Sequence, residues 1–206
     1  TYVDETKLNI TENHWDSVIG GTDSAETVKG LVFRGGTIYA GSTARENSTA
    51  IGGGGNGFGD VKIHGGNITA VVYSTGTAIG GGIAHTGLGG SASVVINDGK
   101  VFAYNFGQPA HDVIAKYGSS ATTEIIKAAR HIAGTAIGGA SSIMQSGNSS
   151  PADITINGGY VYAESLGGCA IGGGNSVCVT AGSANVNING GTVIANSKGQ
   201  DDYTFS

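Results

Sequence analysis

Aromatic residues with polar neighbours recur along this chain in short segments of alternating apolar residues. An aromatic ring can stack on the C–H groups of a pyranose, while nearby hydroxyl, amide and ammonium groups hydrogen-bond the sugar hydroxyls. The alternative is that these outward residues only favour β-structure, or pack beneath another segment or chain. The candidate ligand-binding residues are Tyr39, Lys100, Phe102, Tyr104, Tyr160, Tyr162 and Glu164.

Catalysis on a glycan would need more than a binding surface. Two carboxylates, or a carboxylate and a base, must converge near the sugar. Glu164 with Lys100 and Tyr104 is the set near the aromatic residues that comes closest to this requirement. The only Asp-Asp pair, Asp201 and Asp202, lies beyond the last repeat. A polysaccharide lyase or glycoside hydrolase is therefore the third hypothesis, and no catalytic residue is assigned.

Residues 104–134 interrupt the repeat and form a second candidate site. A helix is expected over residues 120–132, with Glu124 in its first turn and Lys127 and Arg130 towards its end, as the helix dipole favours. Long insertions in repeat proteins tend to lie on the binding face, although a segment that only buttresses the solenoid is an equal alternative. Acid–base or metal chemistry could come from His111, Asp112, Lys116, Tyr117 and His131.

Carboxylates and cysteines allow two further kinds of site. Some β-helix proteins bind Ca²⁺ between turns through carboxylate oxygens, but the acidic residues here do not form a dense repeated pattern. Calcium is kept as an optional cofactor, and no other is expected. Cys169 and Cys178 are compatible with one small disulfide or with two reduced thiols, and they lack the neighbours of a metal site. The carboxylates considered for Ca²⁺ are Glu46, Asp60, Asp98, Asp153 and Glu164.

Two motifs alternate along most of the chain and predict the elements that position these residues. The first reads VKIHGGNITA at residues 61–70, and its copies begin at residues 31, 61, 94, 154 and 186. The second reads TAIGGG at residues 49–54 and recurs at residues 77, 135 and 169, with SVIGG at residues 17–21 as an earlier copy. The first motif therefore begins at intervals of 30, 33, 60 and 32 residues, and the long interval contains the insertion.

Apolar residues alternate on both sides of the Gly-Gly corner in the first motif, which is the period of a β-strand. One unit cannot bury its apolar side, but coils stacked in register bury continuous columns. The sequence predicts an all-β, right-handed parallel β-helix of about five coils with one helix-containing insertion. An antiparallel sandwich would need more frequent turns, and a propeller a longer repeat. The expected inward columns begin at Leu31, Phe33, Ile38, Ala40 and Ile51.

The whole chain, residues 1–206, is expected to form one domain. Residues 1–16 would cap the solenoid, residues 17–196 contain the repeats, and residues 197–206 form a tail. Before the Gly-Gly corner, Asn97, Asn157 and Asn189 occupy equivalent positions. Three stacked Asn residues resemble the asparagine ladders of right-handed β-helices, so their expected role is structural.

The alternation of INGG strands with AIGGG turns over about residues 17–196 resembles the glycine-rich β-helix repeats of bacterial surface and secreted proteins. These are often carbohydrate-binding, and at fold level they resemble the pectate-lyase-like superfamily. The resemblance implies an extracellular or cell-surface location and a polysaccharide or glycan partner, as in adhesins. Enzymes of that superfamily carry aspartate clusters or paired catalytic aspartates, and this chain lacks them.

The composition and charge of the chain further restrict the kinds of partner that are expected. The chain has 206 residues and 39 glycines, is 39% hydrophobic and carries a net charge of −5. Its ten Lys and Arg residues form no basic stripe, and no apolar run approaches the length of a membrane span, so neither nucleic acid nor membrane insertion is expected. The leading hypothesis is an extracellular carbohydrate-binding or adhesion module. The alternative is a structural stalk, or a segment that self-associates through the solenoid ends.

Overall fold

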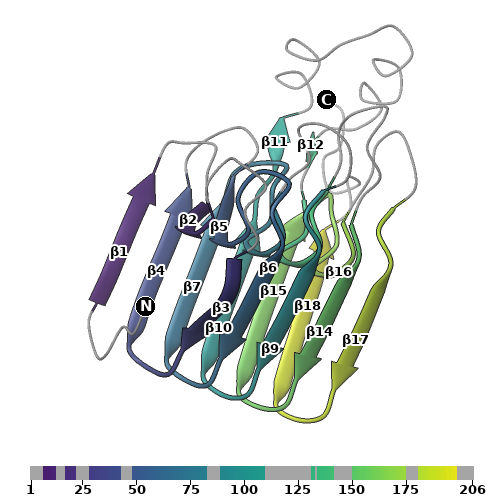
Figure 1. Cartoon of the computed structure of the whole chain (residues 1–206). Helices are drawn as coiled ribbons and strands as arrows, with labels where there is room; N and C mark the ends of the chain where they lie inside the picture. Colours follow the sequence, from purple (N-terminus) through teal and green to yellow (C-terminus); the bar gives the residue numbers. More distant parts are fainter. Residues whose placement is uncertain are drawn as a thin grey trace, which may run out of the picture.

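The computed structural model winds the chain into a parallel β-solenoid with three sheets (Figure 1). No helix occurs among the described residues, so none of them forms a helix long and apolar enough to cross a membrane. The predicted all-β parallel solenoid is confirmed. The structure describes residues 7–12, 17–21, 28–42, 48–82, 89–109, 131–132, 134–141, 150–174 and 181–198.

The largest sheet has six parallel strands in the order β1-β4-β7-β10-β15-β18. Its first strand comes from the segment that was expected to cap the N-terminal end, and it pairs in register with β4. The candidate ligand-binding residues all belong to the strands of this six-stranded sheet. Its strands are β1 (Lys7–Glu12), β4 (Thr37–Ser42), β7 (Asn67–Val72), β10 (Lys100–Asn105), β15 (Tyr160–Leu166) and β18 (Thr192–Lys198).

Two five-stranded sheets complete the coils, and each coil takes one strand from each sheet. Among the described strands, four coils are complete, and β1-β2 and β17-β18 add a partial coil at either end, close to the five expected. The β3 sheet contains β3 (Val28–Phe33), β6 (Gly59–Ile63), β9 (Ala92–Ile96), β14 (Ala152–Ile156) and β17 (Ala184–Ile188). The β2 sheet contains β2 (Ser17–Gly20), β5 (Thr49–Gly52), β8 (Ile79–Gly80), β13 (Ile137–Gly138) and β16 (Ile171–Gly172).

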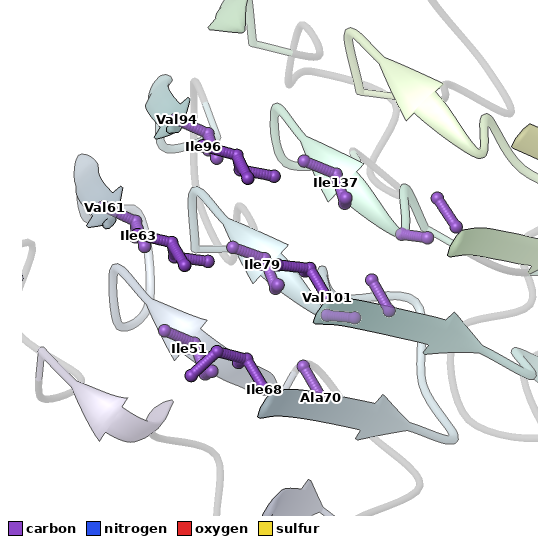
Figure 2. Close-up of a cluster of buried hydrophobic side chains, with 14 of the residues drawn as sticks. Ile51, Val61, Ile63, Ile68, Ala70, Ile79, Val94, Ile96, Val101 and Ile137 are labelled. Atoms are coloured by element: carbon purple, nitrogen blue, oxygen red, sulfur yellow. The ribbon is translucent and has the colours of Figure 1, made fainter. Parts of the chain in front are cut away.

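The core consists of aliphatic side chains stacked from coil to coil (Figure 2). Val61 pairs with Val94, and Ile63 pairs with Ile96, so each column continues in register into the next coil. These four side chains are fully buried, and burying each stabilises the fold by about 1.5–3 kcal/mol. The strand pairing therefore confirms the predicted inward columns, and the alternate residues of each strand must face outward.

Glycine is required where consecutive coils turn. Gly66, the second glycine of a Gly-Gly corner, has φ +96°, and a Cβ there would lie 2.7 Å from the carbonyl oxygen of Gly36. In the AIGGG motif, Gly52 has φ +140°, and a Cβ added there would overlap the carbonyl oxygen of Gly80 in the next coil. Both the backbone conformation and the close approach of the neighbouring coil exclude a side chain.

An amide ladder runs along the outer edge of the Gly-Gly corners. Asn189 Nδ2 donates to Asn157 Oδ1 at 2.8 Å, and Asn157 Nδ2 donates to Asn97 Oδ1 at 2.8 Å. The Asn97 amide meets His64 Nδ1 at 3.0 Å, so the ladder extends by one coil beyond the three predicted residues. Because each hydrogen bond contributes about 1 kcal/mol, the ladder reinforces the stacking that the core begins.

The insertion enters and leaves the solenoid through a short antiparallel pair. Strand β11 (Gln108–Pro109) pairs with β12 (His131–Ile132), with Gln108 opposite Ile132. The expectation that a helix continues to Ile132 is wrong at its last two residues, because they pair with a distant strand. The rest of the expected helix lies outside the described residues.

Replacing Gly66 with Ala should destabilise the protein by more than about 2 kcal/mol, since positive φ alone costs an L-residue about 1–2 kcal/mol. Gly35 is the first glycine of the preceding corner, and an added Cβ there meets nothing within 4 Å. Gly35→Ala should therefore change the unfolding free energy, measured by urea denaturation, by less than about 1 kcal/mol. Equal losses in the two variants would contradict the corner geometry.

Candidate functional site

Six aromatic rings form one continuous series of contacts on the outer face of the six-stranded sheet. Phe102 lies 5.7 Å from Tyr160 and 6.5 Å from Tyr162, measured between ring centroids. Tyr104 lies 5.6 Å from Tyr162 and 5.8 Å from Phe106, and Phe106 lies 5.1 Å from Tyr73. We call these six residues the aromatic strip: Tyr73, Phe102, Tyr104, Phe106, Tyr160 and Tyr162.

Strand alternation explains why these rings face outward. Val101 and Ala103 of β10 are fully buried in the core, so Phe102 and Tyr104 between and after them point away from it. The same alternation along β15 places Tyr160 and Tyr162 outward, on either side of buried Val161. In-register pairing then sets Phe102 directly opposite Tyr162.

Tyr39 does not belong to this strip. It occupies the same outward column as Phe102, but strand β7 lies between them and contributes Thr69 to the column. The Tyr39 ring instead lies over Gly41 of its own strand, where an added Cβ would come within 2.8 Å of Tyr39 Cε1. The prediction of one strip that includes Tyr39 is therefore wrong for that residue and correct for Phe102, Tyr160 and Tyr162.

A nearly buried carboxylate borders the strip. Glu164 is 8% exposed and lies opposite Tyr104 in the sheet. Its Oε1 lies 2.8 Å from Lys198 Nζ, and its Oε2 accepts a hydrogen bond of 2.5 Å from the Tyr162 hydroxyl. The same hydroxyl accepts a hydrogen bond from Asn196 Nδ2 at 3.1 Å. This network fixes the Tyr162 ring by its polar end and satisfies the carboxylate.

The network decides the charge state of Glu164. Burial by itself would raise the pKa of Glu164, but hydrogen bonds from Lys198 and Tyr162, the Lys198 charge and an Asn196 hydrogen bond together hold it below its ordinary value. Glu164 is therefore a carboxylate at neutral pH, the opposite of a general acid kept protonated by its surroundings.

The pKa of Tyr104 is shifted in the opposite direction, upwards. Burial raises the pKa of the Tyr104 hydroxyl, and the nearby Tyr162, Glu164 and Tyr160 add to the increase. The phenol therefore stays protonated at neutral pH, so it can donate a hydrogen bond to a ligand but cannot act as a base there.

The structure brings together only part of the set considered for catalysis. Tyr104 and Glu164 are cross-strand neighbours, whereas Lys100 lies four residues before Tyr104, about 13 Å away along β10. Among the described residues, Glu164 is the one carboxylate that lies with the aromatic strip, and its contacts tie it to Lys198 and Tyr162. The geometry offers a binding surface with one internally compensated carboxylate.

Four members of this surface were missed by the sequence analysis: Tyr73, Phe106, Asn196 and Lys198. Tyr73 and Phe106 directly follow strands β7 and β10, three residues beyond the alanine that ends each copy of the motif. Continuing the alternation past the motif would have found them. The contact of Lys198 with Glu164 is a diagonal one between strands and has no signal in the sequence.

The other proposed sites fall largely outside what the structure describes. His111, Asp112, Lys116, Tyr117, Cys178 and Glu46 lie outside the described residues. Cys169 is an exposed free cysteine, and its bridge to Cys178 stays a prediction. No group of three or more His, Cys, Asp or Glu side chains among the described residues could hold a metal ion, so calcium also stays untested.

The solenoid and its outer strip define the chain as a parallel β-solenoid repeat protein with an aromatic surface on one sheet. Comparison with protein-family models, curated proteins and solved structures finds no match to this chain.

The Glu164 network gives the protein a pH-dependent stability. Because the pKa of Glu164 is lower in the folded state, its contribution is complete at neutral pH and is lost as the pH falls through that lowered value. Glu164→Gln should be less stable than the wild type at pH 7, and the difference should shrink as the pH falls below the ordinary glutamate pKa of 4.5. Chemical denaturation at several pH values measures this.

Asp153→Asn is the matched control, since it removes the same charge from an exposed position on the β3 sheet. It should leave the stability at pH 7 nearly unchanged. A Glu164→Gln protein as stable as the wild type at every pH would show that the network contributes nothing.

Proposed function

We propose that this protein is a carbohydrate-binding module that holds a glycan against the aromatic strip of the six-stranded sheet. The supporting observation is the unbroken series of five ring contacts from Tyr160 to Tyr73, on an outward face of the solenoid. Aromatic rings flanked by polar groups match the apolar C–H faces and the hydroxyl rims of sugars.

The exposure of the rings supports a ligand surface. Tyr73 is 47% exposed, and the other five rings of the strip are partly exposed, so each ring has a face or edge available. Contiguous exposed aromatic surface is uncommon in soluble proteins unless it has a partner. Polar groups stand beside it on both flanks: Thr69 on β7 and Asn196 on β18.

Strand pairing does not require aromatic residues at this outward position, which supports a role in binding. The column that contains Phe102 and Tyr162 contains Thr69 and Ile194 in neighbouring coils. Stacked coils therefore accept small, polar or aliphatic residues at this outward position. The rings at Phe102 and Tyr162 are better explained by a ligand than by the needs of strand pairing.

We further propose that binding takes place outside the cell or at its surface, in an adhesion or polysaccharide-capturing role. This part rests on the resemblance of the repeat to the glycine-rich β-helices of bacterial surface proteins. An enzyme remains a weaker candidate, since the described part of the strip holds a single carboxylate and that carboxylate is already paired.

Phe102→Ala should weaken glycan binding by about 1–3 kcal/mol, the scale of stacking on one aromatic ring, or roughly 5- to 150-fold. Phe102 lies mid-strip and its apolar side chain makes no polar contact, so its loss removes stacking alone. A glycan array followed by calorimetry on the best ligand measures the effect.

The matched control is Tyr39→Ala, which removes an aromatic ring from the same outward column but away from the strip. It should bind like the wild type. If neither the array nor polysaccharide pull-down shows binding by the wild type, the proposed function is wrong.

A second candidate function, self-association, is favoured by the last coil. Val186 and Ile188 of β17 are 39% and 55% exposed, whereas Ile154 and Ile156, their partners in β14, are fully buried. β16, β17 and β18 each lie at the edge of their sheet, with one side unpaired among the described strands. This end matches one more coil of the same repeat, and we propose that a second copy of the chain supplies it.

Ile188→Lys should abolish such association, because it places a charge where the next coil would pack. Asn187→Lys adds the same charge on the outward face of β17 and should leave association unchanged. Light scattering coupled to size-exclusion chromatography over a range of concentrations distinguishes them. A wild type that stays monomeric at every concentration would rule this role out.

A further inference from the structure

The aromatic strip runs along the strands, not along the solenoid axis. Tyr160 and Lys100 share the first outward level of β15 and β10, and Tyr162 and Phe102 share the next. Tyr104 lies at the third level, opposite Glu164. Phe106, which follows β10, and Tyr73, which follows β7, extend the strip to a fourth level.

The strip is long in one direction and narrow in the other. From the level of Lys100 to Phe106 is six residues, or about 20 Å at about 3.3 Å per residue, roughly the length of four pyranose units in an extended chain. Across the strands, Phe102 and Tyr162 belong to neighbouring strands about 4.8 Å apart. The flanking strands contribute Thr69 and Ile194 at the same level, so at this level the strip is two rings wide.

Successive aromatic rings of the strip are evenly spaced, and most are tilted relative to their neighbours. The centroid distances along the strip lie between 5.1 and 6.5 Å, and four of the five pairs are tilted by 31° to 47°. The pair of Tyr104 and Phe106 is almost parallel, at 9°. A linear oligosaccharide, in which each sugar ring is turned relative to the one before it, can place successive sugars against successive aromatic rings. A single planar ligand cannot.

Polar groups border the long sides of the strip. Asn196 and Lys198 stand on the β18 side, held by Tyr162 and Glu164, and the Lys198 side chain is 51% exposed. Thr69 and exposed Asn67 stand on the β7 side. A ligand lying along the strip would thus have apolar faces over the rings and hydroxyl groups along both edges.

We infer that the strip takes a linear glycan of equatorially linked pyranoses, lying parallel to β10 and β15, with contacts to roughly four sugar units. Equatorial linkage keeps the C–H faces of successive units flat and accessible, which suits a series of rings. This inference rests on the proposed function and adds to it the direction, the length and the linkage class of the ligand.

The experiment uses ladders of β-1,4-linked glucose, xylose and N-acetylglucosamine oligomers, two to eight units long, titrated into the intact chain. In whichever oligomer series binds, the affinity should rise roughly fivefold or more for each added sugar unit up to about four units. This is the gain expected from one further stacked ring. Longer oligomers should bind with the same affinity per site.

Variants at the two ends of the strip test its direction. Tyr73→Ala and Tyr160→Ala should each lower the affinity for the longer oligomers and leave that for the dimer nearly unchanged, since short ligands can shift to the remaining rings. Tyr39→Ala should change neither, because a chain lying along the strip does not reach it. Thermal denaturation of each variant establishes that the fold is retained.

The outcomes separate this inference from the proposed function. Binding that does not increase beyond two units, or that Tyr39→Ala weakens as much as Tyr160→Ala, would overturn the direction while leaving carbohydrate binding intact. Preference for α-linked or branched glycans over all three ladders would overturn the linkage class. Failure of the wild type to bind any glycan would instead overturn the proposed function itself.

Discussion

In-register stacking of successive coils is the constraint on which the whole structure depends. Parallel pairing at about 4.8 Å places each residue directly beside its counterpart in the next coil, so every column must tolerate its own repetition. Isoleucine and valine satisfy this inside the solenoid, where Ile63 lies beside Ile96. Glycine satisfies it at the corners, where a Cβ at Gly66 would press against the previous coil. Asparagine satisfies it at the outer edge, since one amide donates to the next.

Because the inward columns and corners carry the stacking, the outward columns are free to vary. Neighbouring coils place threonine, phenylalanine, tyrosine and isoleucine at one outward position without any break in register, as Thr69 and Phe102 show. A solenoid can therefore acquire a surface on a few strands while keeping its interior unchanged. Here the rings are concentrated on β10 and β15, the strands of the six-stranded sheet that come before and after the insertion in the sequence.

The buried carboxylate follows a different physical rule from the rings. Moving Glu164 out of water is costly. The cost is offset only because Lys198 contacts one of its carboxylate oxygens and Tyr162 contacts the other. The same contacts restrain Tyr162 and connect β15 to β18. Polar chemistry at this site therefore organises the aromatic surface, and the ion pair brings a cation to its edge without leaving an uncompensated charge inside.

The sequence by itself determined the solenoid, its columns, its glycine corners and the asparagine ladder, because each depends on a local period that repeats. It also identified Phe102, Tyr160 and Tyr162 as outward rings, since alternation alone settles which face a residue takes. Tertiary structure decided what depends on neighbours in space: that Thr69 separates Tyr39 from the strip, that Lys198 reaches Glu164, and that Ile132 pairs with Gln108 where a helix was expected. Those contacts join residues from different strands. The repeat period of the sequence does not encode how far, or in which direction, their side chains reach.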